Sequence, residues 1–210
     1  MTIEEFLHST LGADLTGHDE KHAYRVWENA ELIMKETGGD HAYVKGCCLL
    51  HDCLDEKLGL NTEAQESKVF SLLLENGLDE DKAKRMLSSM KRMSFHLHDN
   101  ENLSLEDKII RDADRLDAVG EIGIARALAY GAWKGRPFFS EKDKIDIRNG
   151  FAPHSESTVS HFYEKLLRLD SGMHTETAKE EARKRKVTMI DYLKARFAEE
   201  GLPFDESLLP

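Results

Sequence analysis

The stretch DEKHAYRVWENAELIMKETGG, from Asp19 to Gly39, decides the fold class. His22, Val26, Ala30 and Ile33 recur at intervals of three and four residues, so they fall on one face of a helix with 3.6 residues per turn. The paired glycines at positions 38 and 39 mark the end of this helix. The segment therefore predicts one long helix with a continuous face for packing.

The same periodicity continues through the rest of the chain. Asp40 is a candidate N-cap for a helix that leads to His51, and Thr62 with Gln65 forms a capping-box pattern for the next helix. Alternating β-type runs are nearly absent, and all four prolines stand at position 137 or later. We therefore predict an all-α protein. Further helices are expected near residues 79–95, 104–118, 120–131, 157–169 and 175–200.

The length of 210 residues is consistent with one compact domain. We expect a single domain over residues 1–200, with its core at 17–130 and C-terminal helices at 155–200. The segment 131–153 is rich in glycine, proline and charge, which predicts a long loop or lid. Residues 201–210 are expected to form a loosely held tail.

The charge balance excludes several classes of function. The chain has 29 basic and 40 acidic residues, a net charge of −11, and such a surface repels nucleic acid. No apolar stretch approaches the roughly 20 residues that span a bilayer, and the acidic N-terminus does not resemble a signal peptide. We expect a cytoplasmic protein that binds neither nucleic acid nor membrane. A homodimer is neither required nor excluded, and a small phosphorylated ligand is compatible with a locally positive cleft.

Cys47, Cys48 and Cys53 all lie within seven residues of one another, beside a His-Asp pair. An odd, clustered set without a CxxC spacing cannot form a disulfide framework for a chain of this length. We interpret these cysteines as buried, reduced thiols rather than as metal ligands.

Three segments carry residues suited to metal chemistry. They contribute His22, the adjacent pair His51 and Asp52, and Asp114. Imidazole nitrogen together with carboxylate oxygen suits Mn²⁺, Fe²⁺, Co²⁺ or Zn²⁺. Neighbouring side chains on a helix diverge by about 100°, so His51 and Asp52 reach one ion most readily near a helix end. Each residue alone has a plain structural interpretation, and only the combination is informative.

The order and context of these residues resemble a known family. The blocks HDxxHxxRVxxNA, LLHD, RDADRLDAVGEIGIAR and HFYEKLLRL…TETA occur in that order between Gly17 and Glu199. They resemble the HD-domain superfamily of metal-dependent phosphohydrolases, and within it the bacterial HD hydrolases that act on nucleotides as pyrophosphohydrolases. The resemblance implies an HD-domain helical bundle with additional C-terminal helices.

By this resemblance, one divalent cation is bound by His22, His51, Asp52 and Asp114. Asp112 is an alternative to Asp114, but Asp114 directly precedes the Arg-Leu pair, as in related enzymes. Mn²⁺ is the favoured ion, with Mg²⁺, Co²⁺, Fe²⁺, Ni²⁺ or Zn²⁺ as alternatives.

Charged residues near the predicted metal ligands are candidates for catalysis and substrate binding. Asp55 and Glu56 come three and four residues after Asp52 and are candidates to orient water or act as general acid and base, as the acidic pair does in related HD hydrolases. Lys57 is a candidate for catalysis and for phosphate binding. The other candidates for substrate binding are Arg25, Arg115 and Lys165.

The leading functional hypothesis is hydrolysis of a phosphoanhydride in a nucleoside triphosphate. The alternatives are a 5′-nucleotidase, a phosphodiesterase, or a sensor that binds metal and nucleotide without turnover. We expect Trp27 and Trp133 to pack in the core or the lid rather than to stack on a base.

Overall fold

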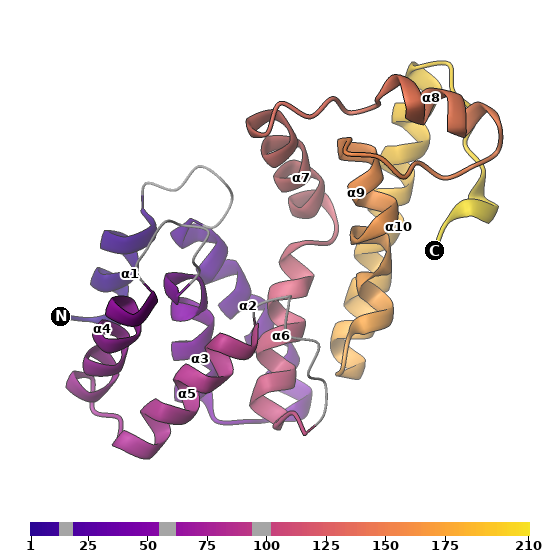
Figure 1. Cartoon of the computed structure of the whole chain (residues 1–210). Helices are drawn as coiled ribbons and strands as arrows, with labels where there is room; N and C mark the ends of the chain where they lie inside the picture. The colour runs from indigo at the N-terminus through magenta and orange to yellow at the C-terminus, as the bar shows by residue number, and fades with distance from the viewer. Residues whose placement is uncertain (13–18, 55–61, 94–101) are drawn as a thin grey trace. The chain divides into compact units, whose positions relative to one another are not determined.

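The computed structural model describes residues 1–12, 19–54, 62–93 and 102–210, and every regular element in these ranges is a helix (Figure 1). The prediction of an all-α fold is confirmed. The chain divides into two compact units, Met1–Asp114 and Arg115–Pro210, which are described in turn.

The first unit packs around α3, which contacts α1, α2, α5 and η1. Helix α3 is almost entirely apolar, and seven of its ten residues, including Val44 and Leu50, are buried. A helix without a polar face has to be covered on several sides, which places α3 at the centre of the unit. The helices of this unit are α1 (Ile3–Leu11), α2 (Glu20–Thr37), α3 (His41–Leu50), η1 (His51–Leu54), α4 (Thr62–Glu75) and α5 (Glu80–Met93), together with residues 105–114 of α6 (Leu105–Asp117), whose last turn belongs to the second unit.

Side-chain caps set where these helices begin. Asp19 accepts a hydrogen bond from the backbone of α2, and Asp40 accepts one from Tyr43 N at 3.0 Å in α3. Ser104 and Asp107 cap α6 reciprocally, with hydrogen bonds of 3.0 and 3.2 Å. The cap predicted at Asp40 is thus present, and Ser104 begins the helix expected from residue 104; each cap depends only on residues within one turn. The predicted cap at Thr62 involves a side chain outside the described residues.

The second unit is built on α10 (Glu176–Glu199), which contacts α7 (Glu121–Trp133) and η3 (Leu166–Gly172). Helix α9 (Thr158–Glu164) contacts the same two elements. Phe162 of α9 and Phe197 of α10 are among the largest fully buried side chains. The remaining elements of the unit are α8 (Glu141–Arg148) and η4 (Glu206–Leu208).

The segment 131–153, expected to be a loop or lid, contains helix α8. A capping box between Ser140 and Asp143 starts this helix. The Asp143 side chain is fully buried and accepts hydrogen bonds from the hydroxyls of Ser140 at 2.7 Å and Ser155 at 2.6 Å. This buried carboxylate attaches α8 to the residues that precede α9. A role of the segment as a lid stays a prediction.

The C-terminal tail contacts α10, in contrast to the loose tail expected. Leu202 is 5% exposed, and the rings of Phe204 and Phe197 lie edge to face with centroids 5.2 Å apart. Lys194 of α10 forms an ion pair with Glu206 at 2.6 Å. An apolar pair with its charged neighbour therefore attaches the last ten residues to the helix.

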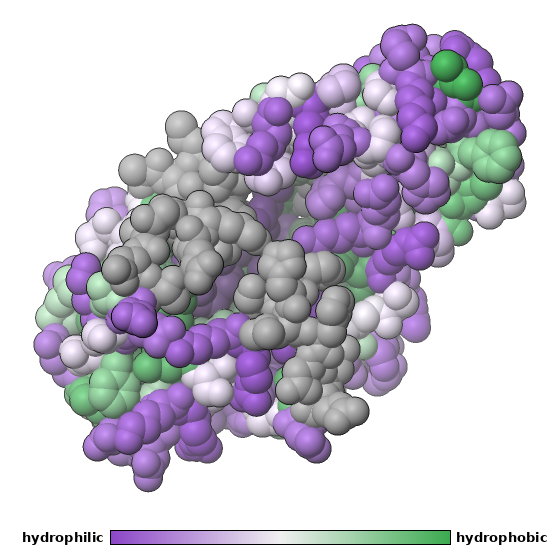
Figure 2. Space-filling model, viewed as in Figure 1, coloured by the Kyte–Doolittle hydropathy of each residue, from purple (hydrophilic) through white to green (hydrophobic). Residues whose placement is uncertain are grey.

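The described surface is mainly hydrophilic on the face that Figure 2 shows, with apolar residues in small separate patches. None of the helices in the described ranges combines the length and apolar composition that a membrane crossing requires.

Candidate metal centre

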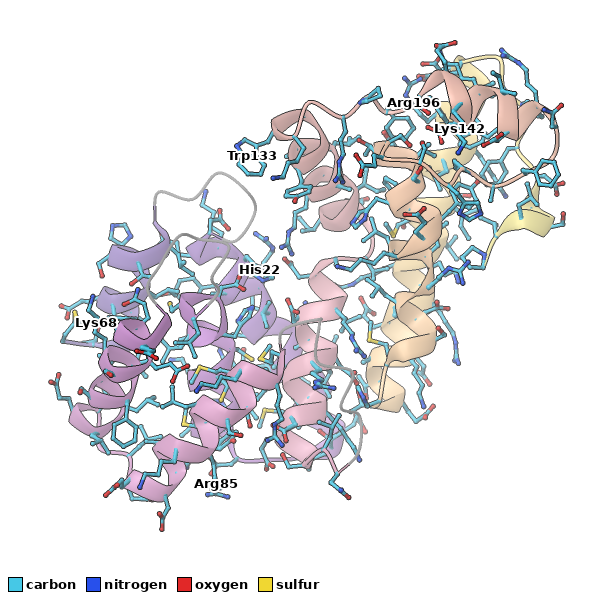
Figure 3. The ribbon with its side chains drawn as sticks, in the orientation of Figure 1. His22, Lys68, Arg85, Trp133, Lys142 and Arg196 are labelled. Atoms are coloured by element: carbon cyan, nitrogen blue, oxygen red, sulfur yellow. The ribbon has the colours of Figure 1, made fainter. Side chains whose placement is uncertain are left out.

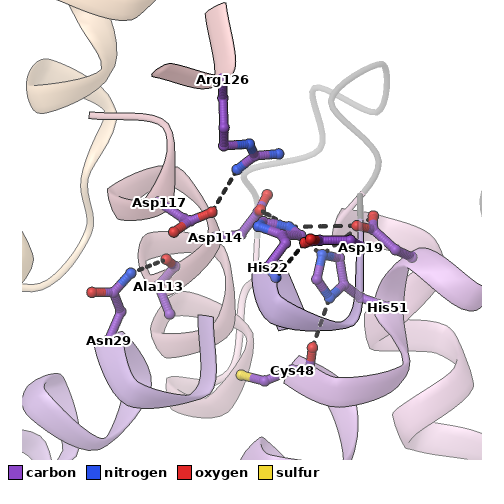
Figure 4. A network of polar contacts seen from close by, with 10 residues as sticks. Asp19, His22, Asn29, Cys48, His51, Ala113, Asp114, Asp117 and Arg126 are labelled. Carbon is purple, nitrogen blue, oxygen red and sulfur yellow. Dashed lines mark hydrogen bonds and ion pairs between the residues drawn. The ribbon is translucent and has the colours of Figure 1, made fainter. Parts of the chain in front are cut away.

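Four side chains of the first unit converge on one point (Figure 4). Nε2 of His22 lies 3.4 Å from Oδ2 of Asp52 and 3.4 Å from Oδ1 of Asp114. Nε2 of His51 lies 3.3 Å from Oδ1 of Asp52 and 3.8 Å from Oδ1 of Asp114. Possible ligand atoms of His22, His51 and Asp114 all lie within 4.8 Å of one another. The Asp52 carboxylate contacts both imidazoles.

Local structure positions each of these groups. His22 stands in the first turn of α2, where its backbone N–H donates to Oδ1 of the N-cap Asp19 at 2.8 Å. Helix α3 ends at Leu50 and the 3₁₀ turn η1 begins at His51. The change of helix type at this point lets two adjacent side chains reach the same place, as the sequence had suggested.

The ring of His51 is oriented by a backbone carbonyl. Its Nδ1 lies 2.8 Å from the carbonyl oxygen of Cys48, which can only accept, so Nδ1 carries a proton and donates it. Its Nε2 is buried and has no hydrogen-bond partner among the residues that the structure describes. A buried nitrogen of this kind is costly unless a proton or a cation satisfies it. In metal sites, a hydrogen bond at one ring nitrogen commonly orients the other toward the ion.

The charges also suit a cation. Two carboxylates face two imidazoles, and three of the four groups are buried: His22 is 1% exposed, His51 8% and Asp52 7%. Asp114 is more open, with 36% of its side chain exposed. Burial raises the pKa of Asp114, but the hydrogen bond from His22 and the electrostatic interactions with His51 and His22 outweigh burial and lower the pKa to about 2.

The donor set therefore fits a divalent metal ion. Two nitrogens and at least two carboxylate oxygens converge from three separate helical segments, and oxygen-rich mixed sites of this type suit first-row divalent metals. The identity of the ion is not determined by these residues. Assignment of the four side chains as ligands stays a prediction, now with a geometry that favours it.

Asp114, rather than Asp112, contributes to the cluster. Asp112 lies two positions earlier on α6 and is fully buried. Residues two apart on a helix point in different directions, about 200° around the axis, so only one of them can face the histidines. Choosing Asp114 by its position before Arg115 agrees with this arrangement.

The structure describes only some of the other candidate site residues. Asp55, Glu56 and Lys57 lie outside the described residues. Arg25 is half-buried and stands one helical turn after His22 on α2.

Two further candidates belong to the second unit. Arg115 donates a hydrogen bond to the carbonyl of Gly172, which gives it a structural role there. Lys165 stands at the C-terminal end of α9.

The sequence motifs predict no role for Asn29, which the structure identifies as a positioning residue. Asn29 is 7% exposed, and its Nδ2 donates to the carbonyl oxygen of Ala113 at 3.1 Å. This bond connects α2, which carries His22, to the residue directly before Asp114. The available signal was a polar residue seven positions after His22, two helical turns along the same face.

Two other expectations have clear outcomes. Cys47, Cys48 and Cys53 are buried and free, as predicted. Trp27 is 9% exposed and belongs to the core, but Trp133 is 58% exposed and does not. Of the two alternatives for Trp133, packing in the core is excluded, because its position at the last residue of α7 leaves the ring beyond the packed part of the helix. Packing in a lid stays a prediction.

Comparison with known proteins identifies the family. The HD domain family model matches residues 20–119. YpgQ of Bacillus subtilis (strain 168) is 33% identical over 195 residues, which cover 91% of this chain and 89% of YpgQ. The crystal structure of B. subtilis YpgQ in complex with ADP matches with a TM-score of 0.76 at 32% identity, covering 94% of this chain and 92% of that one. An HD-superfamily hydrolase from Bacillus thuringiensis matches with a TM-score of 0.75 at 34% identity, over 95% of both chains. The chain therefore belongs to the HD superfamily of hydrolases.

Proposed function

We propose that this protein is a metal-dependent phosphohydrolase that cleaves a phosphoanhydride bond of a nucleotide, with a nucleoside triphosphate as the favoured substrate. The observation that carries the proposal is the convergence of His22, His51, Asp52 and Asp114 around one point, with Nε2 of His51 directed into the group. One divalent cation, with Mn²⁺ favoured, would be held by these four residues.

When bound, such a cation would lower the pKa of a water molecule toward neutrality and polarise a phosphoryl oxygen. The protein itself supplies the arrangement. Asp52 contacts both histidines and keeps them in one orientation, while the hydrogen bond from His51 to the Cys48 carbonyl sets which ring nitrogen faces inward. Because Asp114 is the most exposed of the four, a substrate would approach from its side.

Charged residues near the four proposed ligands would bind substrate and move protons. Arg25 lies on the same helix as His22, one turn later, where a guanidinium suits a phosphate oxygen. Asp55 or Glu56 would accept the proton of the attacking water, and Lys57 would neutralise charge that develops on the phosphoryl group. Arg115 and Lys165 are the remaining proposed contacts to substrate.

The nucleotide assignment has independent support from a relative. B. subtilis YpgQ, 32% identical over nearly the whole chain, has been crystallised in complex with ADP. A protein of this family with an intact His/Asp cluster and a net charge of −11 suits a small anion held by local cations better than a polyanion. We propose that the reaction takes place in the cytoplasm.

The test is a phosphate- and pyrophosphate-release screen of the purified full chain. Nucleoside mono-, di- and triphosphates are each combined with Mn²⁺, Mg²⁺ or Co²⁺, and metal content is measured by elemental analysis. Hydrolysis of triphosphates should be metal-dependent. Asp52→Ala and Asp114→Ala should each lower kcat/KM by at least about three orders of magnitude, because several kcal/mol of charge stabilisation is lost.

Asp191→Ala is the matched control, since it removes an exposed carboxylate from α10. It should retain the activity of the unaltered chain. Tight nucleotide binding without turnover under any metal would favour a sensor. Preferential release of phosphate from monophosphates would favour a 5′-nucleotidase.

A further inference from the structure

An aromatic and cationic cluster lies at the C-terminal end of α7, in the second unit. We call it the α7 patch and define it as Tyr130, Trp133, Lys134 and Arg136. The rings of Tyr130 and Trp133 have centroids 5.8 Å apart at an interplanar angle of 42°. Lys134 Nζ lies 4.3 Å from the Trp133 centroid and 5.8 Å from the Tyr130 centroid, and the Arg136 guanidinium carbon lies 5.9 Å from the Tyr130 centroid.

The aromatic rings of the α7 patch are open to solvent. Trp133 is 58% exposed and Tyr130 37%. Figure 3 shows Trp133 projecting from the end of α7, away from the helix. An exposed tryptophan keeps a large apolar surface in water, and such rings are enriched where proteins bind ligands. Because the Lys134 ammonium lies over one face of the Trp133 ring, a stacked ligand would take the opposite face.

The cations of the α7 patch differ from many others on the protein in having no carboxylate partner among the described residues. Within the described part of the chain, neither Lys134 nor Arg136 forms an ion pair, whereas Lys144, Lys179 and Arg196 each pair with a glutamate. In a chain with a net charge of −11, two cations gathered beside exposed rings without a carboxylate partner form a local positive site.

The pKa of His161 responds to the positive charge of Arg136. Burial lowers the pKa of His161, and the charges of Lys165 and Arg136 lower it further, to about 4. Arg136 and Lys165 therefore act on the same region of α9. A bound anion would be stabilised by both of them.

These features together fit a ligand with a flat aromatic part and an anionic part. A nucleobase stacks on an exposed tryptophan without requiring a specific base, and an arginine binds phosphate oxygens through two parallel hydrogen bonds. We propose that the α7 patch is a nucleotide-binding site of the second unit, in which Trp133 stacks on the base and Arg136 with Lys134 contacts the phosphates. The inference rests on the proposed function only for the class of its ligand, a nucleotide, and it involves residues of the second unit alone.

A single strand of nucleic acid would use the same chemistry, but the remaining charge of the chain opposes it. Stacking proteins of that type combine aromatic residues with an extended basic groove. The α7 patch offers two rings and two cations in an acidic protein. We therefore argue for a mononucleotide, and binding of oligonucleotide becomes an outcome of the test.

The test uses the full chain with EDTA present, so that nucleotide binds without turnover. ADP is titrated while tryptophan fluorescence is recorded, and Kd is measured separately by calorimetry. The chain has two tryptophans, and Trp27 is buried, so quenching reports Trp133. Trp133→Ala should weaken ADP binding by at least about fivefold, consistent with the loss of one base-stacking contact. It should leave the affinity for inorganic pyrophosphate unchanged.

Arg136→Ala should weaken both ADP and pyrophosphate by a similar factor, since both carry phosphate. Phe151→Ala and Lys142→Ala are matched controls that remove an exposed aromatic residue and an exposed cation elsewhere in the second unit. Both should bind ADP like the unaltered chain. Unchanged ADP affinity in Trp133→Ala, or tighter binding of oligothymidylate than of ADP, would overturn the inference.

Hydrolysis of inorganic tripolyphosphate with Mn²⁺ separates this inference from the proposed function. That substrate lacks a base, so its turnover depends on the metal centre and not on Trp133. If the unaltered chain binds ADP through the α7 patch but hydrolyses no phosphate compound, the proposed function fails and the α7 site stands. If the chain hydrolyses tripolyphosphate and nucleotides, and Trp133→Ala and Arg136→Ala keep the unaltered Kd for nucleotide, the α7 site fails and the proposed function stands.

Discussion

The two ring nitrogens of His51 have different partners, and substitutions can separate their roles. Nδ1 donates to the Cys48 carbonyl, and Nε2 faces the carboxylates of Asp52 and Asp114. An asparagine amide can replace the Nδ1 donor but provides nothing in place of Nε2. His51→Asn should therefore fold with little change in stability and lose more than about 100-fold in Mn²⁺ affinity, because loss of even an outer partner costs 10- to 100-fold.

Isothermal titration with Mn²⁺ and urea unfolding measure the two effects separately. His41→Asn is the control, since His41 is an exposed histidine at the start of α3. It should bind Mn²⁺ like the unaltered chain. Retention of Mn²⁺ affinity in His51→Asn would remove His51 from the ligand set.

At the scale of helices, the packing of α7 on α9 depends on a missing side chain. A Cβ at Gly131 would lie 2.2 Å from Oγ1 of Thr158, which is 5% exposed. Alanine normally stabilises a helix interior by about 1 kcal/mol relative to glycine, but crowding of a packed site costs about 1–3 kcal/mol. Gly131→Ala should therefore destabilise the protein by about 1 kcal/mol.

The effect of Gly131→Ala on the free energy of unfolding should change sign when the crowding at Thr158 is removed. In a Thr158→Ala background, Gly131→Ala should become neutral or stabilising, because the remaining Cβ of residue 158 stands at an ordinary contact distance of 3.4 Å. Urea unfolding of the four chains in this double-mutant cycle gives the coupling free energy. Additive effects would show that the two helices do not meet at this position.

The stability of the whole molecule should respond to mild acid through His161. Burial, and then the charges of Lys165 and Arg136, lower the pKa of His161 to about 4, below its ordinary value of 6.5. As the pH falls below 6.5 the unfolded chain takes up a proton that the folded chain does not, so stability declines until the pH approaches 4. Between pH 7.5 and 5.5 this contribution amounts to about 1 kcal/mol.

His161→Gln removes the titrating group and keeps a neutral polar side chain. Urea unfolding at both pH values should show that the variant loses about 1 kcal/mol less than the unaltered chain. His174→Gln serves as the comparison, since it removes a histidine elsewhere in the second unit. An equal acid response in the unaltered chain and in His161→Gln would contradict the assignment.

Sequence alone determined the helices and the identity of the cluster residues. Periodicity and helix caps depend on residues within a few positions of one another, so they can be recognised without knowledge of the fold. Examples are the periodic set His22, Val26, Ala30 and Ile33 and the caps at Asp40 and Ser104. The family blocks then named His22, His51, Asp52 and Asp114. The sequence did not predict α8, although its Ser140 to Asp143 capping box is equally local, because the glycine, proline and charge of the surrounding segment favoured a loop.

Tertiary structure alone decided how these residues are used. Positions 22, 51 and 114 lie far apart along the chain, and only packing around α3 and the bond from Asn29 to the Ala113 carbonyl bring their ligand atoms together. The exposure of Trp133 likewise depends on how its helix packs, whereas the inward direction of His51 Nε2 is set locally by the Cys48 carbonyl three residues earlier. Local pattern encodes short-range hydrogen bonds and periodic polarity, whereas the exposure of each side chain and the distances between ligand atoms are set by contacts between segments that the pattern does not specify.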